Sequence, residues 1–199
     1  MTTFLRRVLW PAFALLVAMT LITGVAYPAV VTAVAQVAFP HQANGSMLVA
    51  KDGRTVGSSL IGQAFSGDTY FWGRLSAAGA TDDNPLGYDA SSSAGSNLGP
   101  TNQDLLDRVE QSVADYQAAN PGVPIPVDLI TTSASGLDPH ISPAAAEYQV
   151  ARVATARGLS EADLRAVVAR HTEQPLFGIF GQPRVHVLEL NLDLDGLLQ

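Results

Sequence analysis

VLWPAFALLVAMTLITGVAY, residues 8–27, directly follows Arg6 and Arg7 and contains no charged side chain. It opens a longer segment, residues 8–50, that lacks Asp, Glu, Lys and Arg altogether. Twenty helical residues rise about 30 Å, which is the thickness of the hydrocarbon core of a bilayer. A helix pairs its backbone N–H and C=O groups internally, so it can place these apolar side chains in lipid. The sequence therefore predicts one N-terminal membrane-spanning helix.

A cleavable signal peptide is the alternative interpretation of this segment. Its positive n-region would precede residue 8, and Ala33-Val34-Ala35 fits the small-x-small pattern of a cleavage site. The apolar run that reaches this site has 28 residues, whereas a signal peptide needs an apolar region of only about 7–15. We therefore expect a retained anchor over residues 8–35, in which Pro28 marks a kink or the outer end.

Charge predicts the orientation and the class of the remaining chain. Basic residues beside a membrane helix stay in the cytoplasm, so we expect residues 1–7 inside the cell and residues 36–199 outside it, as a single domain of a single-pass cell-membrane protein. All 18 acidic residues but only nine of the 11 basic residues lie in this external part, which gives it a net charge of −9. Such an acidic segment argues against nucleic acid as a partner. The absence of cysteine excludes disulfides and a thiol nucleophile.

The first part of the external segment predicts two short strands followed by a long loop. Residues 46–50 and 54–61 have strand character on either side of the turn residues 51–53. Residues 66–100 are dense in Gly, Ser, Asn, Asp and Pro, and the stretch 91–100 carries loop signals only. A long loop inside a compact domain is usually either functional or disordered.

Two helices are predicted in the C-terminal half from their end signals. The first begins at a capping box formed by Thr101 and Asp104, after which apolar residues recur at helical spacing. The second begins with Ser142 as N-cap and Pro143 at the first helical position, and it ends at Gly158, which suits a left-handed cap.

A third helix and two further strands complete the predicted fold. The helix begins at the capping box of Ser160 and Asp163 and ends near His171. Residues 127–132 and 185–194 are rich in β-branched and apolar residues, and we predict a strand at each. Because strands and helices occur without a regular βαβ rhythm, we predict an α+β domain behind the membrane helix.

Residues 133–140, SASGLDPH, contain the residue types of a hydrolase. A membrane-tethered external hydrolase that uses Ser135, Asp138 or His140 is therefore the alternative function. A nucleophilic triad needs its members to converge from different elements, which eight consecutive residues do poorly. We favour a tight turn whose side chains cap the helix that follows, with no catalytic residue.

Residue spacing indicates no metal site and no tightly bound cofactor. Asp138 and His140 could bind a metal, but no spacing selects the third ligand from Asp68, Asp82, Asp83, His41, His171 and His186. The phosphate-binding pattern G-x-x-x-x-G-K-[ST] is absent, and no G-x-G-x-x-G follows a predicted strand. The Gly/Ser loop of residues 92–99 offers backbone N–H groups but lacks a Lys or Arg to balance an anion.

Small residues recur at helical spacing within the predicted anchor. Ala14 with Ala18, and Thr20 with Gly24, would allow another membrane helix to approach closely. We take Thr20 and Gly24 as the candidate contact with a partner helix.

Several sequence blocks, in order along the chain, carry a family resemblance. They are QANGS (42–46), GSSLIGQ (57–63), GRLSA (73–77), GSNLGPTN (95–102), TSASGLDPHI (132–141), AAEYQVARVA (145–154), GQPRV (181–185) and LELNL (188–192). Over essentially its whole length the chain resembles the C subunit of the bacterial Kdp potassium-transporting ATPase. Two positions depart from the family pattern. Leu75 stands in the segment Arg74-Leu75-Ser76-Ala77, where the family usually has Arg-Pro-Ser-Ala, and His186 stands where Asn is usual.

The resemblance implies a non-catalytic accessory subunit of an ATP-driven potassium uptake pump. It implies two partners, a channel-like potassium-binding subunit and a P-type ATPase subunit, whose assembly the C subunit stabilises. The family is also described as a catalytic chaperone that raises the ATP affinity of the ATPase subunit, and its nucleotide-signature glutamine corresponds to Gln149. Because an external domain cannot meet cytoplasmic ATP, we expect any such effect to pass through the partner subunits.

We therefore expect the external domain to act through interfaces. Gln149, seven residues after the helix cap at Ser142, is expected to hydrogen-bond a neighbouring loop such as residues 97–102. The candidate interface residues lie in the blocks that carry the resemblance: Asn97, Asn102, Ser135, Gly136, Asp138, His140 and Arg152.

Overall fold

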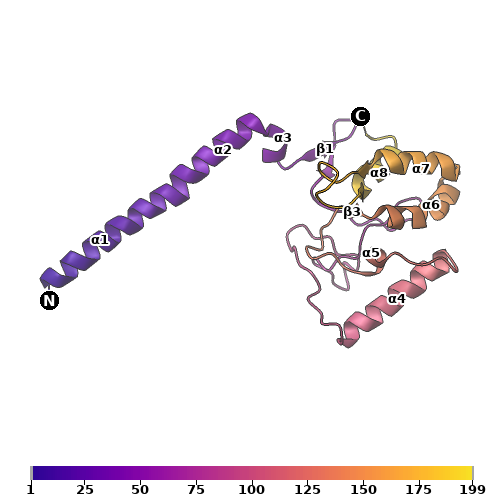
Figure 1. Cartoon of the computed structure of the whole chain (residues 1–199), viewed down its shortest axis with the longest axis horizontal. Helices are drawn as coiled ribbons and strands as arrows, with labels where there is room; N and C mark the ends of the chain where they lie inside the picture. Colours follow the sequence, from indigo (N-terminus) through magenta and orange to yellow (C-terminus); the bar gives the residue numbers. More distant parts are fainter. Residues whose placement is uncertain (1, 199) are drawn as a thin grey trace. The chain divides into compact units, whose positions relative to one another are not determined.

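The computed structural model describes residues 2–198. They divide into two compact units, and the division lies between Met47 and Leu48. The first unit is one long helix followed by a short one, shown in indigo and purple in Figure 1. Its elements are α1 (Thr2–Leu21), the π-helical turn η1 (Ile22–Ala26), α2 (Tyr27–Ala38) and α3 (Pro40–Ala43).

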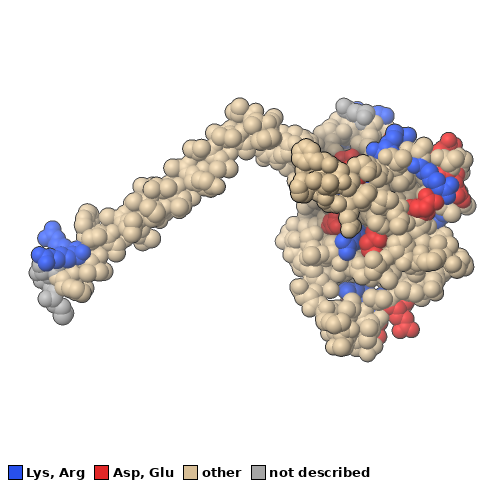
Figure 2. Space-filling model, viewed as in Figure 1, with Lys and Arg blue, Asp and Glu red and all other residues tan. Residues whose placement is uncertain are grey.

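The helical span Phe4–Ala38 is long and apolar enough to cross a membrane. Its most apolar stretch of 18 residues has a mean hydropathy of 2.1, and no residue of that stretch is buried within the chain. The predicted anchor, residues 8–35, lies entirely within it. Figure 2 shows basic side chains at the N-terminal end of this helix and uncharged ones along the rest of the visible face. The structure therefore has the helix that the sequence predicted, extended at both ends.

The long helix does not end at Pro28. A proline lacks the N–H of the i→i−4 hydrogen bond, and its ring clashes with the carbonyl one turn earlier. Here the π-helical turn η1 precedes it, and Tyr27 donates its backbone N–H to the carbonyl of Ile22, five residues back. The wider turn accommodates the proline, so the helix continues to Ala38.

The described residues include two small sheets. The predicted strands near residues 46–61 are present as the hairpin β1 (Met47–Val49) and β2 (Thr55–Ser58), whose turn contains Gly53 at φ +82°. The other sheet has the order β3-β5-β4, formed by β3 (His140–Ile141), β4 (Thr172–Glu173) and β5 (Arg184–His186).

The predicted helices are all present. In α6 (Pro143–Arg157) the hydroxyl of Ser142 accepts from the N–H of Ala145, and Gly158 takes the left-handed conformation at φ +66°. In α7 (Glu161–Arg170) Ser160 caps as expected. The cap of α4 (Gln103–Ala119) differs by one residue, because Asn102, and not Thr101, accepts from the N–H of Asp104 at 2.7 Å.

The strand predicted at residues 127–132 is wrong. These residues form a short helix, α5 (Val127–Ile130), with Pro126 at its N-cap. Asp128 turns toward α6, where its carboxylate accepts from the N–H and the hydroxyl of Ser142 at 2.8 and 3.1 Å. This tertiary contact favours the helical turn over the local preference for strand.

The strand predicted at residues 185–194 is also mostly wrong. Only β5 is extended, and the chain then turns into α8 (Val187–Leu194), because the imidazole of His186 accepts from the N–H of Glu189 and caps the helix. Five of the eight residues of α8 are buried. A helix buried on most sides gives a continuous apolar run, which periodicity cannot distinguish from a buried strand.

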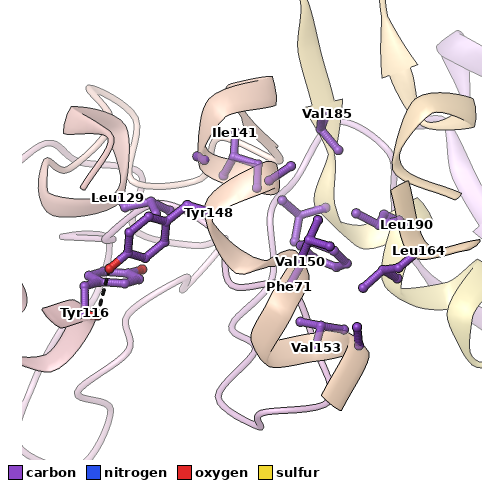
Figure 3. Packing of buried hydrophobic residues seen from close by; sticks show 14 residues of the cluster. Phe71, Tyr116, Leu129, Ile141, Tyr148, Val150, Val153, Leu164, Val185 and Leu190 are labelled. Atoms are coloured by element: carbon purple, nitrogen blue, oxygen red, sulfur yellow. Dashed lines mark hydrogen bonds between the residues drawn. The ribbon is translucent and has the colours of Figure 1, made fainter. Parts of the chain in front are cut away.

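The core of the second unit surrounds α6, so the predicted α+β class describes its mixture of helices and small sheets. Val150 and Val153 of α6 are fully buried together with Leu164 of α7 and Leu190 of α8. On the other side, Tyr148 donates its hydroxyl to the backbone carbonyl of Tyr116 on α4 at 2.7 Å (Figure 3). Residues 59–102 contain neither helix nor strand beyond single bridges, in agreement with the loop predicted at residues 66–100, whereas the strand predicted at residues 54–61 ends at Ser58.

Candidate functional site

Gln149 lies on α6 with 1% of its surface exposed. Its side-chain oxygen accepts from the backbone N–H of Trp72 at 2.8 Å, and its nitrogen donates to the carbonyl of Trp72 at 3.1 Å and to that of Ala145 at 3.2 Å. The amide thus pairs with a loop residue as a strand neighbour would. The loop it binds is not residues 97–102, so that expectation is wrong.

Asn191 on α8 binds the preceding loop residue in the same way. Its oxygen accepts from the N–H of Phe71 at 2.9 Å, and its nitrogen donates to the carbonyl of Phe71 at 2.9 Å. Asn191 is 1% exposed. Sequence reasoning missed it as a site residue, although a lone amide among the leucines of residues 188–192 was a visible signal, since buried polar groups need partners.

Arg152, one turn after Gln149, binds three more carbonyls of the same loop. Its guanidinium donates to Gly67 at 3.3 Å, to Asp68 at 2.9 Å and to Tyr70 at 3.1 Å. It also donates to the side-chain oxygen of Gln149 at 2.7 Å. Burial lowers the pKa of Arg152, although the nearby charge of Asp68 opposes the shift.

Residues 67–72, here called the clamped segment, are therefore held mainly by side chains, besides one backbone hydrogen bond from Tyr70 to Gly67. The remaining carbonyl, that of Thr69, accepts from the guanidinium of Arg157. All six carbonyls from residue 67 to residue 72 accept from a side chain of α6 or α8. Because buried backbone groups must be paired, these helices replace the sheet that the segment lacks.

Trp72 is fixed on both sides of its ring. The guanidinium of Arg152 lies 3.7 Å from the indole centroid, within the range of a cation–π contact. The indole N–H donates to the carbonyl of Gly67 at 2.9 Å, and Tyr116 packs with its ring centroid 5.7 Å away. The aromatic residues Tyr70, Phe71 and Trp72 thus lie in the part of the long loop that the side chains of α6 and α8 hold.

A cavity of about 480 Å³ lies beside the clamped segment, between α4 and residues 64–88. Aromatic and arginine side chains dominate its lining, including Phe65, Trp72, Arg74, Tyr88, Arg108 and Tyr116. Burial raises the pKa of Tyr116 to about 12, so its hydroxyl stays protonated at neutral pH. Gln149 and Arg152 do not line this cavity, and Gln149 has its donors and its acceptor oxygen engaged elsewhere.

The turn at residues 133–140 does not form a hydrolase triad. Asp138 and His140 lie together, with Asp138 accepting from the N–H of His140 at 3.0 Å and lying 3.3 Å from its imidazole. The exposed hydroxyl of Ser135 accepts instead from the N–H of Leu137 at 3.1 Å. Among the described residues, no hydrogen bond joins Ser135 to Asp138 or His140.

Asp138 acts as a local ionic anchor. Besides His140, the guanidinium of Arg74 reaches it at 3.4 Å. Burial acts to raise the pKa of Asp138, but the hydrogen bonds from His140 and the charges of His140 and Arg74 outweigh it and lower the pKa. The expectation that this turn caps α6 is wrong, because Asp128 binds the cap residue instead.

Gly136 occupies the left-handed region at φ +68° and lies against neighbouring backbone. A Cβ there would come within 2.6 Å of the carbonyl oxygen of Ala94 and within 2.7 Å of the nitrogen of Ala78. Asn97 is also left-handed, at φ +52°, and donates to the carbonyl of Gly95. These residues shape the loop surface, and the described residues contain no group of three metal-ligating side chains.

Comparison with known proteins yields one consistent result. The sequence model of the KdpC family, described as "K+-transporting ATPase, c chain", matches residues 9–196. A relative from Sorangium cellulosum is 59% identical over 188 residues, which is 94% of this chain and 96% of the relative. One from Rhodopseudomonas palustris is 56% identical over 191 residues (93% and 96%), and one from Dechloromonas aromatica is 54% identical over 195 (97% and 99%). Each relative bears the name "Potassium-transporting ATPase KdpC subunit".

Proposed function

The chain belongs to the KdpC family, the c chain of K+-transporting ATPases, and from this membership we propose that it stabilises the assembled Kdp pump through interfaces and performs no chemistry itself. Its partners in this proposal are the channel-like potassium-binding subunit and the P-type ATPase subunit. The helix Phe4–Ala38 supports the proposal, since no residue of its most apolar 18-residue stretch is buried within the chain, which leaves these side chains free to contact lipid or partner helices. In the membrane it would hold the subunit beside its partners with residues 1–7 in the cytoplasm and residues 36–199 outside.

The observation that carries the proposal is the state of Gln149. By resemblance this is the nucleotide-signature glutamine, yet it is 1% exposed and both ends of its amide bind Trp72. A nucleotide could contact it only after these hydrogen bonds had broken, which would leave the half-buried N–H and C=O of Trp72 unpaired at a cost of about 1 kcal/mol or more each. The geometry thus favours a structural role for Gln149.

An effect on ATP affinity remains part of the proposal, but as a property of the complex. A subunit that binds one conformation of its partners more tightly shifts their equilibrium and thereby their affinity for a ligand. The second compact unit, from residue 48 onward, is external in this proposal and is called the outer unit below. Because α6 and α8 hold residues 67–72 in place, it presents a fixed surface, which suits such a role. ATP itself would then bind only to the ATPase subunit.

Copurification and topology together test the proposed function. The full pump is expressed with a tag on the ATPase subunit, with and without this chain. We expect the channel-like subunit to remain bound in mild detergent only when the chain is present. A Gln111→Cys variant, at an exposed position on α4, should react with an impermeant thiol reagent in intact cells. Labelling that requires lysis would overturn the orientation, and an unchanged complex without the chain would overturn the assembly role.

A further inference from the structure

Residues 174–183, here called the apolar hairpin, project between β4 and β5 and present large apolar side chains to solvent. The exposed fractions are 64% for Leu176, 83% for Phe177, 74% for Ile179 and 64% for Phe180. Scattered apolar residues on a surface need no explanation, but a contiguous cluster marks an interaction site or an aggregation hazard. Four such residues within five positions form a cluster of this kind.

The hairpin is ordered by its own backbone. Leu176 and Phe180 exchange both backbone hydrogen bonds at 3.0 Å, and Gly178 donates to the carbonyl of Pro175 at 2.8 Å. Phe177 lies in the left-handed region at φ +54°, which bulky residues rarely adopt. The most exposed aromatic ring of the outer unit thus stands on a fixed turn, and a pre-organised anchor loses little entropy when it binds.

The absence of charged residues from the hairpin favours a protein groove over a lipid surface as its binding partner. No charged residue lies within residues 174–183, and the two charges at the base, Glu173 and Arg184, pair with each other at 2.6 Å. Segments that bind membrane surfaces combine apolar residues with Lys and Arg, and aromatic anchors at the interface are Trp or Tyr. The hairpin has none of these, and it belongs to a segment of net charge −9.

The small area that the hairpin can bury favours a partner subunit over a second copy of the chain as its binding partner. A buried Phe contributes about 150–250 Å², so this hairpin alone buries less than the roughly 800 Å² per partner of a stable interface. It can anchor a contact only where other contacts already hold the two proteins together. A shared membrane position provides such a constraint, because tethering raises the effective concentration of the second contact.

We propose that the apolar hairpin docks into an uncharged apolar groove on the external face of another subunit of the same pump. This inference rests on the proposed function, since it requires both the complex and the external orientation. Phe177 and Ile179 are the buried anchors of the contact. The ion pair of Glu173 and Arg184 fixes the base of the hairpin at the rim.

Photo-crosslinking in the intact pump identifies the occupant. The full chain is expressed with its partner subunits, and p-benzoylphenylalanine replaces Phe177 in one version and Val123, 48% exposed in the connection from α4 to α5, in the other. We expect illumination to join the chain to a partner subunit from position 177, at least fivefold more than from position 123. Crosslinks to lipid or to a second copy of the chain, or equal yields from the two positions, overturn the proposal.

A double variant measures the energetic weight of the hairpin. Phe177→Ser with Ile179→Ser should lower the fraction of chain that copurifies with the pump by about tenfold or more, as expected for anchor residues of an interface. Leu106→Ser with Val123→Ser, at two 48% exposed positions outside the cavity, is the matched control. Unfolding temperatures should stay equal, which excludes misfolding. If the wild type fails to copurify, the proposed function fails. If the wild type and the double variant copurify equally, only the docking of the hairpin fails.

Discussion

Gln149 and Trp72 bind each other in both directions across 77 residues of sequence, with the Trp72 N–H donating at 2.8 Å and the Gln149 amide donating back at 3.1 Å. Asn191 repeats this arrangement on Phe71 across 120 residues. The two amides thus fix consecutive residues of a segment that has no strand partner. The position that the family resemblance links to nucleotides is, in this structure, one half of a structural clamp.

Replacement of Gln149 by Ala should destabilise the outer unit first. It leaves the half-buried N–H and C=O of Trp72 without their side-chain partner, so we expect the free energy of unfolding of the full chain in detergent to fall by about 2–3 kcal/mol. Gln111→Ala, an exposed glutamine on α4, is the control and should change it by less than about 0.5 kcal/mol. Intact Gln149→Ala pumps with a clearly raised KM for ATP would instead support a direct nucleotide role.

Gly136→Val should be the most damaging change in the turn of residues 133–140. Its side chain would be strained at φ +68° and would collide with the carbonyl of Ala94. Gly122→Val provides a matched control, because Gly122 has φ +78° but open space around its Cβ position. We expect both variants to lose stability and Gly136→Val to lose at least about 2 kcal/mol more in thermal unfolding. Equal losses would show that backbone strain alone decides the effect.

Ser135→Ala and His140→Ala should leave the potassium-stimulated ATP hydrolysis of the assembled pump within severalfold of wild type. The hydroxyl of Ser135 accepts from the backbone N–H of Leu137, its carbonyl accepts from the hydroxyl of Ser93, and the imidazole of His140 lies beside Asp138. Removal of a true nucleophile or general base would cost about a hundredfold or more. A loss of that size in purified complexes with normal subunit content would restore the hydrolase interpretation.

Acid should weaken the contact at Asp138 in a defined range. Because its pKa is lowered in the folded chain, the carboxylate contributes stability above its unfolded pKa of about 4, and this contribution is lost as the pH falls through the lower folded value. Asp138→Asn lacks it at every pH. We expect wild type to be the more stable at pH 7 and the difference to shrink below pH 4, measured by denaturant unfolding. A difference that grows in acid would give the opposite sign.

Thr20→Leu with Gly24→Leu should weaken assembly more than membrane insertion. An added Cβ at Gly24 meets no atom of this chain within 4 Å, so the helix itself tolerates the change, whereas a closely packed partner helix would not. Val17→Leu with Val25→Leu is the control at positions that are already large and exposed. Equal recovery of the pump subunits with both double variants would exclude this face as the contact.

The sequence predicted those elements whose ends carry local signals. Ser142 with Pro143, and Ser160 with Asp163, mark the starts of α6 and α7 within a few residues of the chain. The start of α8 depends on His186, which is not a common capping residue, and α5 depends on a carboxylate that binds the N-terminus of α6. These two elements were misassigned as strands because their decisive contacts are tertiary.

The candidate site was harder to predict for the same reason. Gln149 was singled out by resemblance, but its partner lies 77 residues away, and no periodicity points from α6 to Trp72. Arg152 was named as an interface residue, whereas most of its hydrogen bonds lie within the domain. Asn97 and Gly136 lie in predicted loops, and Asn102 caps α4 where Thr101 was predicted to do so, but contacts of these residues with partner subunits stay a prediction.

The clamp on residues 67–72 also sets an order of events during biosynthesis. Its six carbonyls accept from donors that begin at Gln149 and end at Asn191, more than 70 residues further along the chain than the segment itself. A contact of this kind cannot form before both of its residues have been synthesised, and its large sequence separation makes its formation slow. The loop of residues 67–72 therefore stays without its last partner until synthesis has passed Asn191, and a premature stop anywhere before Asn191 leaves Phe71 without these two hydrogen bonds.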